Sequence, residues 1–134
     1  MKLITWTEFF EKFNKINFKK YDLIVAIAKG GLIPASFIQY KLDIPLQIIH
    51  INFRDKSHNP LYEEPKLLKD FEKIKDKKIL LVDDVSRTGK TLQKAKQILE
   101  DNEIDTFLIN GNANYSLFEE KECLDMPWKT TIGE

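Results

Sequence analysis

The chain has 134 residues, 43% hydrophobic and 31% charged, and its 21 basic and 21 acidic side chains give a formal net charge of zero. This length supports one domain with a hydrophobic core and is too short for two. The balanced charge predicts no surface for nucleic acid or membrane, and no apolar run approaches the length of a membrane span.

The few cysteines and histidines exclude two further classes of protein. Cys123 is the single cysteine, so an internal disulfide is excluded, and a reducing cytoplasmic location is expected. The start of the sequence lacks a secretory apolar segment, which agrees with that expectation. One cysteine and two histidines show no metal-ligand spacing.

The first part of the chain predicts a helix, a buried strand, a glycine loop and a second helix. Thr5 and Glu8 form a capping-box pattern, followed by aromatic residues that recur on one helical face. The apolar run Leu23–Ala28 predicts a strand buried on both faces. Two glycines follow it, and Leu32–Leu42 predicts a helix with a proline in its first turn.

The middle of the chain predicts a second strand, a long polar loop and a short helix. The strand is expected over Leu46–Phe53 and the helix over Lys66–Ile74. Between them, Arg54–Pro65 is polar, and a loop of this length is typical of a lid or a binding loop. We interpret His58 in this loop as a solvated residue rather than a catalytic base.

The run Ile79–Thr91 is the stretch around which the chain is organised. Four apolar residues, Ile79–Val82, predict a buried parallel strand, and Asp83 and Asp84 follow at its carboxyl end. A loop of hydroxyl-bearing and small residues then leads into a helix expected to end near Asn102. A strand followed by acids, a small-residue loop and a helix start predicts an anion site made of backbone N–H groups.

The last part of the chain completes a predicted α/β fold. Thr106–Gly111 is expected to form a fourth strand, and residues 112–134 are less regular. Strands that alternate with helices predict a mostly parallel sheet flanked by helices. Both loops leave strands at the carboxyl edge of that sheet, where ligands of open α/β sheets bind.

The segment Gly89–Thr91 resembles the end of a Walker A loop, but we reject that interpretation. A Walker A loop needs a glycine five positions before Gly89, and Asp84 occupies that position. Its negative charge would oppose a triphosphate.

The run ILLVDDVSRTGKT instead resembles the phosphoribosyl-diphosphate (PRPP) motif of type I phosphoribosyltransferases. The earlier run IVAIAKGGLIPA resembles the pyrophosphate loop of the purine enzymes, especially the xanthine-guanine branch. The resemblance implies a single domain over residues 1–134, with a mobile loop at about 54–65 and a small hood at about 112–134. It also raises the question of a cis peptide at Ala28–Lys29, which the sequence does not decide.

The reaction implied by this resemblance is the displacement of pyrophosphate from PRPP by a nucleobase, expected to be a purine. The product would be a nucleoside monophosphate. The resemblance implies Mg²⁺ as the cofactor and a homodimer or homotetramer as the assembly. Asp84 would contact the metal directly or through a water molecule.

The resemblance also assigns roles to individual residues. Asp83 and Asp84 would hold the ribose hydroxyls, and Arg87 stands at a catalytic position. The residues expected to bind the phosphates of PRPP are Lys29, Gly30, Gly31, Ser86, Arg87, Thr88, Gly89, Lys90 and Thr91. Arg54 and Lys56 would contribute from the mobile loop, and the base pocket would be formed by Asn112, Cys123, Leu124 and Trp128.

Three positions depart from the family pattern, and all concern the nucleobase. Arg87 stands where the 6-oxopurine enzymes have an aspartate, Asn112 where they have a lysine, and Cys123 where an aromatic residue stacks on the base. We therefore expect weak or absent activity with xanthine, guanine and hypoxanthine. Two acceptors stay open: a purine bound differently, or an acidic acceptor attracted to Arg87.

Two functional classes follow from these residues. The first is an active phosphoribosyltransferase with an altered acceptor. The second is a non-catalytic or regulatory protein that binds PRPP or a nucleotide. The acid pair together with Lys29–Gly31 favours the enzyme, because a plain nucleotide-binding protein has no need for a pyrophosphate loop.

Overall fold

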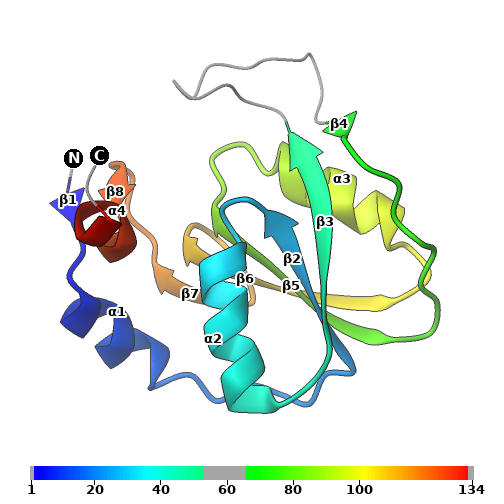
Figure 1. The fold of residues 1–134 in the computed structure, drawn as a ribbon, viewed down its shortest axis with the longest axis horizontal. Coiled ribbons are helices and arrows are strands. Elements are labelled where there is room, and N and C mark those ends of the chain that lie inside the picture. The colour runs from blue at the N-terminus through cyan, green and yellow to red at the C-terminus, as the bar shows by residue number, and fades with distance from the viewer. Residues whose placement is uncertain (1, 53–65, 133–134) are drawn as a thin grey trace.

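A six-stranded sheet forms the centre of the structure, a computed structural model that describes residues 2–52 and 66–132 (Figure 1). Its strands are β2 (Leu23–Ala28), β3 (Leu46–Asn52), β4 (Lys66–Leu67), β5 (Lys78–Val85), β6 (Glu103–Asn110) and β7 (Tyr115–Phe118). Their order across the sheet is β4-β3-β2-β5-β6-β7. All neighbouring strands are parallel except β3 and β4, so the predicted mostly parallel sheet is confirmed.

Helices cover both faces of the sheet. Helices α1 (Trp6–Phe13) and α2 (Leu32–Leu42) lie on one face, and α3 (Lys90–Ile98) lies on the other. Successive side chains of β5 point to opposite faces of the sheet. Leu80 and Val82 pack with α1 and α2, whereas Ile79 and Leu81 pack with α3. Strands with two buried faces read as continuous apolar runs, which is why the central strands could be predicted.

The two ends of the chain lie side by side (Figure 1), and we call the region that they form the hood, although residues 115–118 of the predicted hood belong to the central sheet. Strand β1 (Lys2–Leu3) pairs in parallel with β8 (Leu124–Asp125), and α4 (Pro127–Ile132) follows β8. The ring of Trp128 lies 5.9 Å from that of Trp6 and 5.8 Å from that of Phe9, centroid to centroid. The N-terminal helix and the C-terminal segment therefore share one aromatic core.

Several predicted elements occur where the sequence placed them. Strand β2 and helix α2 have the predicted bounds, and Thr5 and Glu8 form the predicted capping box before α1. The strand expected over Leu46–Phe53 is present as β3 to Asn52, and Phe53 lies outside the described residues. The predicted loop Arg54–Pro65 also lies outside them.

The helix predicted over Lys66–Ile74 is wrong. Lys66 and Leu67 form β4 and pair antiparallel with Asn52 and Ile51 of β3, and the Leu68 amide donates to the His50 carbonyl at 2.7 Å. Leu67 and Ile74 still pack against the α3 side of the core, although the chain between them is not helical. Pairing with the edge of the sheet therefore overrides the local helical pattern.

Strand β7 lies in a segment that the sequence predicted to be irregular. It runs parallel to β6, with Phe107 opposite Tyr115, although only residues 111–114 connect the two strands. Parallel neighbours normally need a much longer crossover. Here Gly111 turns the chain with φ of 145°, and the Asn114 side chain accepts the Thr106 N–H at 2.8 Å.

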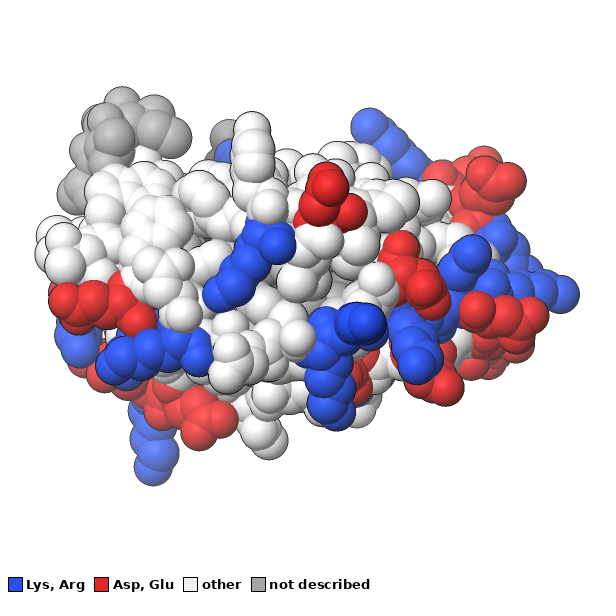
Figure 2. Space-filling view, turned by 90° about the horizontal axis from the view of Figure 1, so that it is seen from below, with Lys and Arg blue, Asp and Glu red and all other residues white. Residues whose placement is uncertain are grey.

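On the face drawn in Figure 2, basic and acidic side chains are interleaved and separated by uncharged surface. Among the helices in residues 2–52 and 66–132, none is long and apolar enough to cross a membrane.

The capping box gives a direct test of how α1 is held. The Thr5 hydroxyl accepts the Glu8 N–H at 3.1 Å, so we expect Thr5→Ala to lower the free energy of unfolding by about 1 kcal/mol. Thr7→Ala, inside the same helix and exposed, is the matched control and should be neutral or slightly stabilising. Urea denaturation measures both, and equal effects of the two variants would contradict a capping role for Thr5.

Candidate functional site

Two loops lie together at the carboxyl edge of the sheet. The first, Lys29–Gly31, connects β2 to α2, and the second, Ser86–Gly89, connects β5 to α3. Strands β2 and β5 are parallel neighbours, with Ala26 opposite Val82, so both loops leave the same edge. The peptide between Ala28 and Lys29 is cis, which answers the question left open by the sequence.

The two loops touch through Gly30 and Asp84. A Cβ atom on Gly30 would lie 2.4 Å from Cγ of Asp84 and 2.4 Å from its Oδ1, which is far closer than atoms can approach. A Cβ atom on Gly31 would lie 2.3 Å from the carbonyl oxygen of Val82. Gly31 is therefore required by its close approach to the β5 backbone, and the Asp84 carboxylate rests directly on Gly30 of the Lys29–Gly31 loop.

The two carboxylates of the acid pair have different surroundings. By strand alternation Asp84 lies on the α2 face and is half-buried, whereas Asp83 lies on the α3 face and is only 7% exposed. Each carboxylate accepts the next backbone N–H: Asp83 that of Asp84 at 2.8 Å, and Asp84 that of Val85 at 2.7 Å. These bonds fix both side chains at the end of β5.

Burial is the main cause of an altered pKa at Asp83. It raises the pKa of this carboxyl well above its usual range, and the neighbouring charge of Asp84 raises it further. The hydrogen bond from the Asp84 amide acts in the opposite direction. The predicted pair thus divides into a half-buried carboxylate that a ligand can reach and a buried carboxyl beneath it.

The second loop has the features of an anion-binding turn, although two of its predicted backbone donors already have acceptors within the protein. Gly89 has φ of 78° and directly precedes α3, and the Thr88 hydroxyl accepts the Lys90 N–H at 3.3 Å. The amides of the first turn of a helix have no acceptor within the helix, which suits them to a phosphate. The Ser86 N–H also donates to the Asn110 carbonyl at 3.3 Å, so the amides of Ser86 and Lys90 both have acceptors within the protein.

Arg87 points away from this loop toward the hood. Its Nη2 donates to Sγ of Cys123, which lies between β7 and β8. Both side chains are exposed. Arg87 and Cys123, two of the three positions at which the sequence departs from the family pattern for the nucleobase, are therefore in contact.

The other predicted base-pocket residues have different positions. Asn112 is exposed and follows Gly111. A Cβ atom built on Gly111 would lie 3.2 Å from the Ser86 carbonyl oxygen, so Asn112 lies close to the second loop. Leu124 is 7% exposed and belongs to the hydrophobic core, and Trp128 packs on α1. The prediction that Leu124 lines the base pocket is therefore wrong, because β8 pairs with β1 and the Leu124 side chain is buried in the core.

Asn110 and Glu120 are functionally placed residues that the sequence did not single out. Asn110 is 5% exposed and forms two hydrogen bonds with the backbone of Glu120, at 2.8 Å and 3.1 Å. Glu120 also accepts from Lys2 Nζ at 3.3 Å. These contacts tie the segment before β8 to the end of β6. The sequence feature that could have indicated Asn110 is an asparagine at the end of an apolar strand.

The residues predicted in the mobile loop, Arg54 and Lys56, lie outside the described part of the chain. Within that part, no group of three or more histidine, cysteine, aspartate or glutamate side chains is placed to hold a metal ion.

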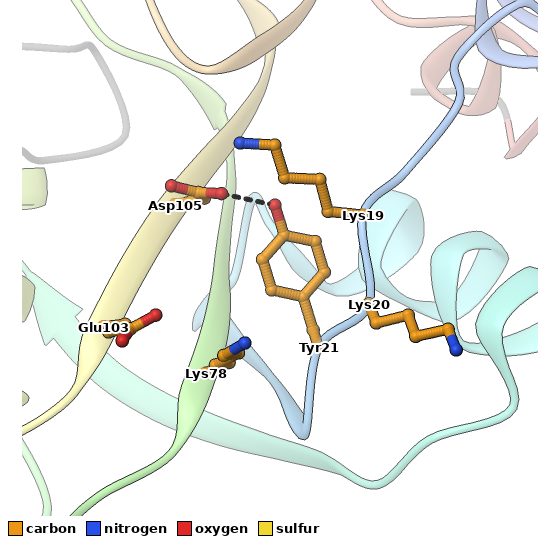
Figure 3. Close-up of a pocket in the computed structure, with 6 residues that line it drawn as sticks. All are labelled: Lys19, Lys20, Tyr21, Lys78, Glu103 and Asp105. Atoms are coloured by element: carbon orange, nitrogen blue, oxygen red, sulfur yellow. Dashed lines mark hydrogen bonds between the residues drawn. The ribbon is translucent and has the colours of Figure 1, made fainter.

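A separate hollow of about 290 Å³ lies at the opposite edge of the sheet (Figure 3). It is lined by Lys19, Lys20, Tyr21, Lys78, Glu103 and Asp105, and Lys78 and Glu103 are the first residues of β5 and β6. The Tyr21 hydroxyl donates to Asp105 Oδ2 at 2.5 Å and lies 2.7 Å from the Tyr115 hydroxyl. Burial is the main cause that raises the pKa of Tyr21, and the network anchors the segment before β2 to β6 and β7.

The comparisons with known proteins agree with this geometry. The family model for the phosphoribosyl transferase domain matches residues 7–107. An orotate phosphoribosyltransferase of Sulfurisphaera tokodaii is 37% identical over 86 residues, which cover 64% of this chain and 40% of the relative. An adenine phosphoribosyltransferase of Treponema denticola is 30% identical over 122 residues, covering 85% of this chain and 64% of the relative.

A solved structure is similar over nearly the whole chain. The purine phosphoribosyltransferase from Pyrococcus horikoshii has a TM-score of 0.77 and 29% identity, and the match covers 95% of this chain and 92% of that one. The family expected from the two loop motifs is therefore confirmed. The match covers only 40% of the length of the orotate relative, well under two thirds.

The two glycines should differ in what their substitution costs. Gly31→Ala forces a Cβ atom against the backbone of β5, so we expect it to lower the free energy of unfolding by about 1–3 kcal/mol. Gly30→Ala meets only the Asp84 side chain, which can rotate away, so its stability should change by less than about 1 kcal/mol. Thermal or urea unfolding compares the two, and the reverse order of stability would contradict the packing described.

Burial of Asp83 predicts a pH-dependent stability. Folding raises the pKa of Asp83 above its value in the unfolded chain, which is about 3.9. As pH rises above that value, the folded chain therefore holds more protons than the unfolded chain, and the free energy of unfolding falls. The loss is at most about 1.4 kcal/mol per pH unit for one group. Asp83→Asn keeps the acceptor for the Asp84 amide and removes the titration.

We therefore expect Asp83→Asn to be more stable than wild type at neutral pH, with the difference vanishing near pH 4. Urea titrations at a series of pH values measure it. A variant that is destabilised equally at every pH would show that the Asp83 charge is not penalised by burial.

Proposed function

The chain belongs to the phosphoribosyl transferase domain family, and from that premise we propose that it transfers the phosphoribosyl group of PRPP to a nucleobase and releases pyrophosphate. The observation that carries the proposal is the contact between Gly30 and the Asp84 carboxylate. It joins a loop suited to a diphosphate to a side chain suited to ribose hydroxyls, within the span of one PRPP molecule.

Each part of PRPP has a matching partner at the sheet edge. The diphosphate would lie at Lys29–Gly31 above β2, where the glycines allow close approach and Lys29 adds positive charge. The ribose hydroxyls would donate to Asp84 above β5. The 5′-phosphate would accept from the backbone amides of Thr88, Gly89 and Thr91 at the start of α3.

These residues would catalyse the transfer by position and charge. The reacting carbon, C1′, gains positive character as the pyrophosphate leaves, and a fixed carboxylate nearby stabilises that charge. Asp84 is held by the Val85 amide before the substrate arrives, so little reorganisation is needed. Asp83, buried beneath, would position Asp84 through its hydrogen bond to the Asp84 amide.

The donor set fits a magnesium ion that arrives with the substrate. Mg²⁺ commonly binds through one or two carboxylates together with substrate phosphates, and Asp84 is a half-buried carboxylate beside the diphosphate loop. Asp84 would hold the ion directly or through a water molecule. The ion, when bound, neutralises charge on the pyrophosphate group.

The acceptor is a nucleobase whose class the relatives leave open. The similar proteins include orotate, adenine and purine phosphoribosyltransferases, so both ring classes are candidates. The purine expected from the sequence therefore stays a prediction, as do the homo-oligomeric assembly and the cytoplasmic location.

A regulatory protein that binds PRPP without turnover is the second candidate. The presence of an arginine at position 87 favours it, because a guanidinium that stays charged cannot accept a proton from an incoming base. The Lys29–Gly31 loop favours the enzyme, since binding alone does not require a site for the leaving group.

Ligand-induced stabilisation tests the PRPP site. We expect PRPP with Mg²⁺ to raise the melting temperature, because a ligand at 100 times its Kd stabilises the folded state by about 2.7 kcal/mol. Asp84→Ala should abolish the shift, and Gly30→Ala should reduce it by displacing the same carboxylate. Lys96→Gln, which removes an exposed charge from the far end of α3, is the control and should keep the full shift. The absence of any shift in the wild type would rule out the PRPP site.

A further inference from the structure

The order of the strands predicts the side of the ribose from which the acceptor would enter. If the diphosphate lies above β2 and the ribose above β5, then the next position along the edge is above β6. Displacement at C1′ requires the acceptor to approach from the side opposite the leaving group. The acceptor must therefore enter above β6, under the hood.

Among the described residues, the Arg87 guanidinium is a positively charged group that extends toward that position. Its backbone lies in the loop after β5, and its Nη2 contacts Cys123 in the hood. The Cys123 backbone is itself fixed, because its carbonyl accepts the Lys2 N–H at 3.1 Å. Asn110 and Glu120 hold the start of the same connection over the end of β6. The contact with Cys123 thus directs the guanidinium toward the hood, the side from which the acceptor would enter.

We propose that Arg87, positioned by Cys123, selects a nucleobase that carries a carboxylate. This inference rests on the proposed function. A guanidinium has five N–H donors in a rigid fork, so the contact with Cys123 leaves capacity for another acceptor. A carboxylate matches that fork with two charge-assisted hydrogen bonds, whereas a neutral ring would leave a charged group partly desolvated and without a counter-charge.

The chemistry balances without a base from Arg87. A ring nitrogen of the acceptor forms the bond to C1′, the bond from C1′ to the diphosphate oxygen breaks, and the electron pair leaves with pyrophosphate. A proton on the reacting nitrogen, where there is one, passes to solvent or to the pyrophosphate. Arg87 stays charged throughout and binds the acceptor only.

Matched pairs of acceptors test this selection. Orotate differs from uracil by its ring carboxylate, and nicotinate differs from nicotinamide by the charge of its substituent. With PRPP and Mg²⁺, pyrophosphate release should be about 100-fold higher in kcat/KM for the carboxylated member of one pair. Adenine, hypoxanthine, guanine and xanthine should be poor acceptors.

Variants separate a role in acceptor binding from a role in phosphate binding. Arg87→Gln should lower kcat/KM for the carboxylated acceptor about 100-fold and leave the Kd of PRPP, measured by calorimetry, within threefold. Cys123→Ala should raise KM for that acceptor with little change in kcat, and Cys123→Ser, which keeps an acceptor for Arg87, should restore most of it. Lys96→Gln should change neither constant.

Three outcomes would overturn the inference. Equal use of both members of each pair, or better use of a purine, would show that no carboxylate is selected. A parallel loss of PRPP affinity in Arg87→Gln would make Arg87 a phosphate ligand. Binding of PRPP without turnover of any acceptor would favour the regulatory protein. A failure to bind PRPP at all would instead remove the proposed function itself.

Discussion

The contact between the Gly30 backbone and the Asp84 carboxylate is the constraint on which the site depends. It exists because β2 and β5 are parallel neighbours whose carboxyl ends meet, and because neither Gly30 nor Gly31 carries a side chain. The cost of this arrangement is a buried carboxyl at Asp83, whose pKa is raised by loss of water. The core on both faces of β5 holds the end of that strand in place.

The central sheet and the two loops could be predicted because they are encoded locally. A strand buried on both faces must be apolar along its length, and a loop pressed against a neighbouring strand must be glycine, so Leu23–Gly31 and Ile79–Gly89 show their structure in their sequence. The capping box of Thr5 and Glu8 is local as well. None of these features depends on a distant partner.

The features that could not be predicted depend on contacts between distant segments. Leu67 is in a strand because Ile51 offers an edge, and β7 is parallel to β6 because Asn114 and Gly111 turn the chain within a few residues. The contact of Arg87 with Cys123 spans 36 positions. The hood is assembled from both ends of the chain, so no local pattern reveals that Leu124 belongs to the core.

A crystal structure of the chain with PRPP and Mg²⁺ would test the central claim most directly. The account predicts ribose hydroxyls within hydrogen-bonding distance of the Asp84 carboxylate and the diphosphate against the Lys29–Gly31 backbone. It also predicts that C1′ is open toward Arg87. A complex in which the diphosphate lies away from Gly30, or in which Asp84 makes no contact with the sugar, would contradict it.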